Sequence, residues 1–145
     1  MPLNLEWFSK ENKNTTKLSN LKSLNSLVYV LASNYAEEKN LDDVIIFNQR
    51  KKPIESSNAN IFVKKDGNLY TTLLSDGCVD GTMRLLICQN FKVVETSFTR
   101  KFLLDAEELF LTNSMGIRWV AKLGNKEYYE NKISKNIVGF LNTLI

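Results

Sequence analysis

The sequence contains no histidine and only two cysteines. The lack of histidine excludes the usual Ser-His-Asp and Cys-His catalytic arrangements, together with the commonest general base. Cys78 and Cys88 lie ten positions apart and without metal-ligand spacing, so we predict that both are reduced and structural and that the chain holds no metal. Any catalysis by this chain must therefore depend on lysine, on carboxylates or on a cofactor.

Long apolar runs are also missing. The longest, residues 27–32, is far too short to span a bilayer, and residues 1–14 hold no apolar stretch of signal-peptide length. The 19 basic and 16 acidic residues are spread along the chain and give a net charge of +3, without the clustered basic face of a nucleic-acid or membrane-surface protein. We therefore predict a cytoplasmic protein that binds neither nucleic acid nor membranes. Binding of a small anionic ligand is compatible with this composition.

The two prolines and six glycines form no linker, and the sequence has no internal repeat. With 145 residues, 43% of them hydrophobic, the chain is long enough to bury a substantial core, so we predict one folded domain. Apolar periodicity predicts a mixed α/β domain with a substantial sheet. The predicted helices cover about 19–39, 82–91, 100–108 and 131–145; the predicted strands cover 5–8, 42–48, 59–65, 69–74, 92–98, 109–114 and two stretches within 117–129, and residues 12–17 are predicted to be a polar loop.

The first predicted helix carries a lysine in its first turn. Its apolar face is predicted to comprise Leu21, Leu24, Val28, Leu31 and Tyr35, and Leu24, Leu27, Val28 and Leu31 are expected to be buried. Lys22 is unusual there, because the positive end of the helix dipole disfavours a cation. The same environment favours the neutral amine, which is the form that attacks a carbonyl carbon. Lys22 is thus either a nucleophilic amine or, like most of the fifteen lysines, a solvated side chain.

Two loops could hold an anion. The sequence "DGTMR" opens a helix and offers free backbone N–H groups at Gly81, Thr82 and Met83. The sequence "LTNS" ends a strand and offers donors at Thr112, Asn113 and Ser114. Each pattern alone is also ordinary turn chemistry, so neither is specific by itself.

Two further polar residues are ambiguous from sequence. Glu55 follows a turn proline, and it is either a solvated surface carboxylate or the partner of a buried cation. Asn60 is either a turn residue or a hydrogen-bonding group that supports a site.

Four ordered motifs together resemble a known family. They are Lys22 in "LKSLNSLVYVLA", Glu55 in "IESSNANIF", the loop "SDGCVDGTMR" and the segment "AEELFLTNSMGIRWV". The set resembles the carboxy-terminal domain of the class IV, fold-type IV aminotransferases, which are pyridoxal-phosphate enzymes that include branched-chain and D-amino-acid aminotransferases and aminodeoxychorismate lyase. The resemblance covers about residues 18–145. It implies an α/β pseudo-barrel in which helices 19–39 and 131–145 pack on a curved mixed sheet.

The resemblance also implies a cofactor, pyridoxal 5'-phosphate (PLP), and roles for the matching residues. Lys22 is the implied catalytic residue, which forms the Schiff base with PLP and then moves a proton between substrate and cofactor carbons. Glu55 is implied to pair with the protonated pyridine nitrogen and so to keep the ring an electron sink. The full set of implied cofactor-binding residues is Lys22, Glu55, Asn60, Gly81, Thr82, Met83, Asn113 and Ser114.

The sequence departs from the family pattern at two points. Many relatives read "GITR" where this chain reads "GTMR", which moves the hydroxyl by one residue and puts Met83 in its place. Family members also carry an amino-terminal domain that supplies a phosphate-binding arginine and much of the substrate pocket. Residues 1–145 are predicted to be the cofactor-binding domain alone, either as a fragment of a longer protein or as a stand-alone half.

Three functions are compatible with this resemblance. We predict a PLP-dependent aminotransferase that acts on an amino acid and a 2-oxo acid, with a homodimer implied by the resemblance. The nearer alternative is a lyase of the aminodeoxychorismate type. The more distant alternative is a cofactor-free remnant that serves as an interaction or dimerisation module.

Overall fold

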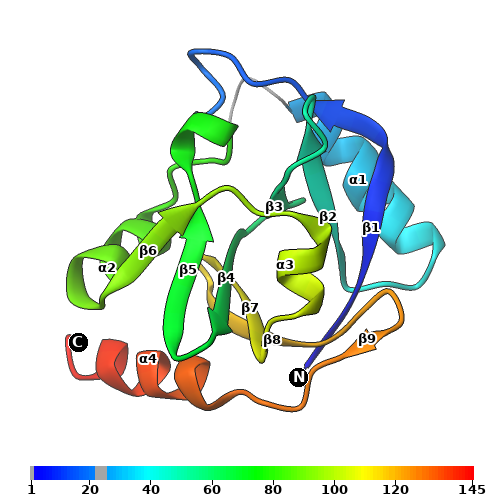
Figure 1. Cartoon of the computed structure of the whole chain (residues 1–145). Helices are drawn as coiled ribbons and strands as arrows, with labels where there is room; N and C mark the ends of the chain where they lie inside the picture. The colour runs from blue at the N-terminus through cyan, green and yellow to red at the C-terminus, as the bar shows by residue number, and fades with distance from the viewer. Residues whose placement is uncertain (1, 22–25) are drawn as a thin grey trace.

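The computed structural model describes residues 2–21 and 26–145. One curled sheet of nine strands forms its centre (Figure 1). The strands are β1 (Leu3–Lys13), β2 (Asp43–Asn48), β3 (Pro53–Ser56), β4 (Asn60–Lys65), β5 (Asn68–Thr72), β6 (Val93–Thr96), β7 (Glu108–Asn113), β8 (Gly116–Leu123) and β9 (Lys126–Glu127). The helices are α1 (Ser26–Glu38), α2 (Thr82–Asn90), α3 (Arg100–Leu104) and α4 (Lys132–Asn142), with a 3₁₀ turn, η2, at Leu74–Asp76.

The sheet is mixed. Its strand order is β3-β2-β1-β8-β7-β4-β5-β6, and β9 pairs with β8. Strand β1 lies parallel to both of its neighbours, β2 and β8, and β5 lies parallel to β6, whereas the other pairs are antiparallel. The β4–β5 hairpin turns at Asp66 and Gly67, which both have positive φ, as a two-residue type I′ turn requires.

Three apolar clusters hold the helices to this sheet. Helix α1 packs on β1 and β2 through a cluster that includes Val28, Ala32 and Ile46. Helices α2 and α4 pack on the sheet around the stacked rings of Phe62 and Phe110. The short helix α3, which lies within the curl of the sheet in Figure 1, contributes Leu103 to the third cluster. Burial of an apolar side chain is worth about 1.5–3 kcal/mol, so these clusters contribute much of the free energy that favours the folded state.

Most predicted elements are confirmed, including the hairpin and the closing helix. Three predictions were wrong. The strand predicted at 5–8 extends to Lys13, so the predicted polar loop begins later than Asn12. Strand β3, which carries Glu55, was missed because it is only four residues long and begins with Pro53, which was interpreted as the end of a turn. Residues 17–20 form a turn rather than the beginning of a helix.

The predicted buried face of the first helix was also partly wrong. Val28 is buried as predicted, but the side chain of Leu27 is 70% exposed and that of Leu31 is 37% exposed. Leu21 is exposed as well. The side chains that face the sheet are Val28, Tyr29, Ala32 and Ala36, with Tyr35 packed beside them. Leu24 and Lys22 lie outside the described residues, so the predicted position of Lys22 in a first helical turn remains a prediction.

Helix α4 begins at a buried carboxylate on β7. The Glu108 side chain is fully buried, and its two oxygens accept hydrogen bonds from the backbone N–H groups of Ile133 (3.0 Å) and Ser134 (2.8 Å). A carboxylate at this position satisfies free N–H groups and complements the helix dipole. Ile137 then anchors the helix in the core. Glu108 therefore fixes where α4 meets the sheet.

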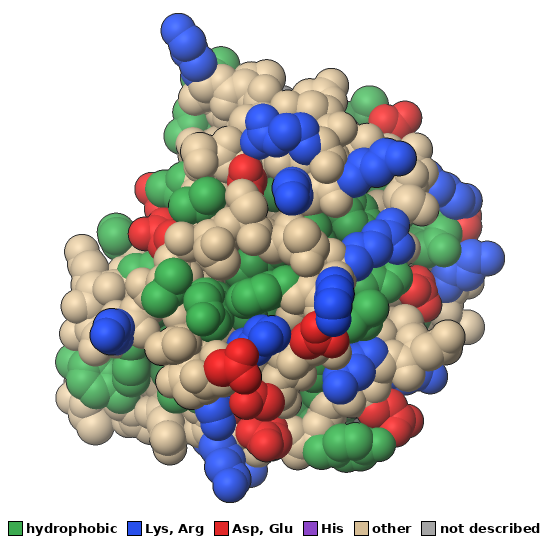
Figure 2. Space-filling model, in the orientation of Figure 1, with side chains coloured by type: hydrophobic (Ala, Val, Ile, Leu, Met, Phe, Trp, Pro, Cys, Tyr) green, Lys and Arg blue, Asp and Glu red, His purple; other side chains and the backbone are tan. Residues whose placement is uncertain are grey.

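The surface has no dominant charge of one sign on the face seen in Figure 2, where basic and acidic side chains are interspersed. Within residues 2–21 and 26–145, no helix has the length and apolar character needed to cross a membrane. In the same residues, no group of histidine, cysteine, aspartate and glutamate side chains is arranged to hold a metal ion. Cys78 and Cys88 are both free, as predicted.

Candidate functional site

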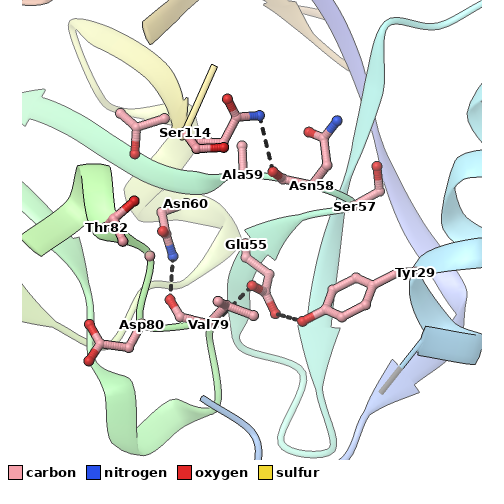
Figure 3. A pocket seen from close by; sticks show the side chains of 13 residues that line it. Tyr29, Glu55, Ser57, Asn58, Ala59, Asn60, Val79, Asp80, Thr82 and Ser114 are labelled. Carbon is pink, nitrogen blue, oxygen red and sulfur yellow. Dashed lines mark hydrogen bonds between the residues drawn. The ribbon is translucent and has the colours of Figure 1, made fainter. Parts of the chain in front are cut away.

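A cavity of about 260 Å³ brings together most of the predicted site residues (Figure 3). This volume is just below the roughly 300–1,000 Å³ typical of small-molecule pockets. Of the predicted set, the residues that line it are Glu55, Asn60, Gly81, Thr82, Asn113 and Ser114. Met83 does not line the cavity, because its side chain packs in the apolar cluster around Phe62. Lys22 lies outside the described residues.

Glu55 forms the floor of the cavity at one end of strand β3, where its side chain is buried. Its Oε2 accepts hydrogen bonds from Lys13 Nζ (2.8 Å) and from the Tyr29 hydroxyl (2.9 Å), and its Oε1 accepts one from the Val79 N–H (3.0 Å). A carboxylate has about four acceptor positions. Because Glu55 also lines the cavity, one acceptor position on Oε1 is available to a ligand.

Lys13 is the buried cation that pairs with Glu55, and sequence reasoning missed it. Its side chain is fully buried at the end of β1. Besides Glu55, Nζ donates to the Tyr29 hydroxyl (2.6 Å) and to the Ser19 carbonyl oxygen (2.7 Å). These three bonds use all three N–H groups of an ammonium ion. Lys13 therefore has no N–H group left to donate to a ligand.

Burial and charge act in opposite directions on Glu55. Burial raises the pKa of Glu55, while the Lys13 ammonium, the Val79 N–H and the Tyr29 hydroxyl act to lower it. Burial, followed by the charge of Glu55, raises the pKa of Tyr29. The hydroxyl group therefore stays protonated and donates a hydrogen bond to Glu55. Of the two alternatives for Glu55, the solvated surface carboxylate is therefore wrong, because the side chain is buried beside a cation.

The amino terminus of α2 forms the opposite wall of the cavity. The N–H groups of a helix's first turn have no partner within the helix, and no side chain caps Gly81 at this end. Asn60 holds the preceding loop, since its Nδ2 donates to the Val79 carbonyl oxygen (2.8 Å). A Cβ atom on Gly81 would overlap Asn60 Oδ1, so a larger residue at this position would have to displace the Asn60 side chain. The wall can thus present N–H groups to an anion.

The third wall is the tight turn between β7 and β8. Asn113 pairs with Gly116, so only two residues form the turn. The Asn113 side chain stiffens it by accepting from the Met115 N–H (2.9 Å) and by donating to the Asn58 carbonyl oxygen (3.2 Å). Thr112 is 1% exposed, and its hydroxyl has no hydrogen-bond partner among the described residues. This unpartnered polar atom is what a polar ligand in the cavity would satisfy.

Both flanks of Lys22 are attached to the cavity. Asn20 donates from Nδ2 to the carbonyl oxygens of Leu74 (2.8 Å) and Cys78 (2.7 Å), in the loop that leads to α2. Tyr29, on the other side, lines the cavity itself. The Asn20 carbonyl oxygen also accepts from the N–H group of Asp80 (3.1 Å), which lines the cavity, so described residues on both sides of the segment contact the cavity lining.

The charged side chains that line the cavity are acidic. They are Glu55 and Asp80, and the lining residues that the structure describes include no lysine or arginine. An anionic group in the cavity would thus be held by the backbone N–H groups and hydroxyls of the described lining. The donors at the α2 end and the carboxylate at the Glu55 end fit the two ends of PLP, a phosphate and a pyridinium nitrogen.

Comparison with known proteins gives a family match over most of the chain. The model of the family described as "Amino-transferase class IV" matches residues 8–123. An aminodeoxychorismate lyase of Vibrio harveyi is 29% identical over 136 residues, which are 87% of this chain and 50% of the relative. A D-alanine aminotransferase of Staphylococcus aureus is 30% identical over 119 residues, which are 78% of this chain and 42% of the relative. The chain spans about half the length of the curated relatives it matches.

A solved structure confirms the predicted fold. The crystal structure of a putative 4-amino-4-deoxychorismate lyase from Legionella pneumophila superposes with a TM-score of 0.90 at 32% identity, over 99% of this chain and 56% of that one. The α/β pseudo-barrel with a curved mixed sheet is therefore the fold of this chain.

Proposed function

Because the chain belongs to the class IV aminotransferase family, we propose that it is the cofactor-binding part of a PLP-dependent aminotransferase that acts on an amino acid and a 2-oxo acid. Family members are PLP-dependent. The observation that carries the proposal is the cavity itself, which sets a carboxylate with a free acceptor position opposite a helix amino terminus. A cationic ring nitrogen and a phosphate need these two groups.

Each of the predicted site residues has a role in this proposal. Lys22 would be the catalytic residue: its amine would hold the PLP aldehyde, and it would supply the base that moves the proton. Glu55 pairs with the ring nitrogen. The N–H groups of Gly81, Thr82 and Met83 bind the phosphate, with further donors at Asn113 and Ser114. Asn60 supports them by holding the loop before α2. When bound, PLP supplies the electron sink for the reaction.

The replacement of the threonine in the family's "GITR" by Met83 is compatible with this arrangement. The Met83 side chain packs into the core, so its backbone N–H, not its side chain, is the group left for the cavity. Thr82 keeps a hydroxyl on the cavity wall. Phosphate binding is therefore expected to be weakened rather than lost.

The decisive experiment traps the lysine that carries PLP. Purified protein is mixed with PLP, reduced with borohydride, digested and mapped by mass spectrometry. We expect an absorbance change on mixing and a pyridoxyl group on Lys22. Lys22→Ala should abolish both, and Lys17→Ala, an exposed lysine five positions away, should change neither. An unchanged spectrum, or a label confined to other lysines, would favour the cofactor-free interaction module.

Lyase chemistry is the second candidate, because lyases are among the relatives in both comparisons. The two activities separate on the PLP-loaded protein. D-Alanine, the substrate in the name of one relative, should change the cofactor spectrum if amino groups are transferred. Consumption of 4-amino-4-deoxychorismate without a 2-oxo acid acceptor would instead show a lyase. Homodimerisation and a cytoplasmic location stay predictions, the first testable by light scattering on the same sample.

A further inference from the structure

The buried ion pair between Lys13 and Glu55 lies directly behind the cavity. Glu55 lines the cavity, whereas Lys13 does not and is fully buried. The carboxylate thus faces the cavity, and the ammonium group lies on the opposite, closed side of it. The closed side joins three elements, because Lys13 lies on β1, Glu55 on β3 and Tyr29 on α1. Lys13 is therefore placed to act on a ligand only through Glu55.

We propose that Lys13 is a positioning residue that keeps the Glu55 carboxylate charged and turned so that one acceptor position on Oε1 faces the cavity. This inference rests on the proposed function, since it concerns the group that receives the ring nitrogen of PLP. Lys13 and Tyr29 together occupy Oε2, and the Val79 N–H occupies one side of Oε1. The carboxylate has little freedom to rotate, because rotation would break these bonds.

The charge of Glu55 needs this support. Burial alone raises the pKa of a carboxyl group, and burial is the largest influence on Glu55. The titratable groups that face it are Lys13, Tyr29 and Cys78, and burial raises the pKa of the Cys78 thiol to about 11, so it carries no charge at neutral pH. Lys13 is thus the cation that favours ionised Glu55. A protonated Glu55 would offer no anion to a pyridinium ring.

The first test uses the protein without PLP. Lys13→Met removes the cation, so the pKa of Glu55 rises further above its unfolded value of about 4.3. A group with a raised folded pKa favours folding at acidic pH, and that benefit is lost as the pH rises through the folded pKa. We therefore expect the melting temperature of Lys13→Met to fall further below wild type as the pH rises from 5 to 8. Lys10→Met, an exposed lysine on the same strand, should show no such divergence.

A variant that lacks both charges separates charge from packing. Lys13→Met combined with Glu55→Gln leaves no buried carboxylate to titrate, so its melting temperature relative to wild type should no longer fall with rising pH. If Lys13→Met alone fails to fold, this double variant should still fold. An unfolded double variant, or an equal loss of stability at every pH in Lys13→Met, would show that Lys13 serves packing only and would overturn the proposal.

The second test measures PLP affinity by equilibrium dialysis. Lys13→Met should bind PLP more weakly at neutral pH, by roughly tenfold for each unit by which the pKa of Glu55 exceeds the pH. The deficit should shrink toward pH 9, and Lys13→Arg should restore most of the affinity. Equal affinity in Lys13→Met and wild type would overturn the proposal. A wild-type chain that binds no PLP would overturn the proposed function instead, while the apo experiment would still decide whether Lys13 holds Glu55 in its charged form.

Discussion

Glu55 and Glu108 are two buried glutamates that the fold uses in different ways. Glu108 turns both oxygens to the backbone N–H groups at the start of α4, and it does not line the cavity. Glu55 is bound by a lysine, a tyrosine and one N–H group, yet it still faces the cavity with an acceptor position. Burial of a carboxylate is thus a poor sign of function by itself. The informative feature is hydrogen-bonding capacity left open toward a space that a ligand can enter.

The largest loss of stability is expected when the Glu55 carboxylate is replaced. Glu55→Gln leaves the Lys13 ammonium buried without a countercharge, which costs about 3–5 kcal/mol of unfolding free energy in comparable pairs. The same change removes the anion for the ring nitrogen, so PLP affinity should fall as well. Urea unfolding and PLP titration measure the two effects. A loss of stability without a loss of affinity would show that Glu55 is structural only.

Glu108→Gln is the matched change on the structural side. An amide accepts one of the two N–H groups but turns a donor toward the other, which leaves a buried donor unpaired at a cost of about 1–3 kcal/mol. Because Glu108 does not line the cavity, PLP affinity in the folded variant should equal that of wild type. A weakened affinity would mean that α4 and the cavity are coupled, and the contrast between the two glutamates would fail.

Two glycines extend the comparison between the cavity and the rest of the fold, because Gly81 lines the cavity and Gly139 lies in α4. Gly81→Ala forces Asn60 away from Val79, because the new Cβ would overlap Asn60 Oδ1. We expect a loss of about 1–3 kcal/mol, as for other overpacking changes, and weaker PLP binding. Gly139→Ala in α4 meets nothing within 4 Å and should stabilise by about 0.5–1 kcal/mol without touching affinity. Thermal melts with and without PLP test both.

The smallest effect is expected on α1. Leu27 is 70% exposed, so Leu27→Gln should change stability by no more than about 0.5 kcal/mol. Val28→Asn, one position along, places an amide in the apolar cluster on β1 and β2 and should destabilise clearly. Equal losses at the two positions in urea unfolding would show that Leu27 is covered in solution.

The fold was largely predictable because its elements are short and strongly patterned. The apolar run of β2 and the Asp66-Gly67 turn each indicate one local structure. The face of α1 was misassigned because leucines lie on both of its sides, and apolar periodicity then gives no unique buried face. Leu27 and Leu31 satisfy the pattern yet are exposed, while the small Ala32 and Ala36 are buried. Close packing on the sheet favours the small residues.

Only the site residues that lie in recognisable motifs could be predicted from the sequence. Glu55, Asn60 and Gly81 were candidates from their local sequence, the resemblance gave them roles, and the structure brings them to one cavity. Lys13 was missed because it sits in the polar stretch "KENKNTTK", where a lysine is indistinguishable from a solvated one. Its pairing with Glu55 joins positions 42 residues apart, which no local pattern indicates. The role of Lys22 stays a prediction.

The position of β1 in the sheet has a consequence for how the chain folds. This strand pairs with β2 and also, through Leu3 and Val120, with a strand from the far end of the sequence. Strand β1 can therefore complete its pairing only after residues 116–123 have been synthesised. Such distant pairings delay folding, because a long loop must be ordered before any contact compensates for it. We expect refolding from urea to be slow for a domain of this size, with closure of the β1–β8 seam as the late step.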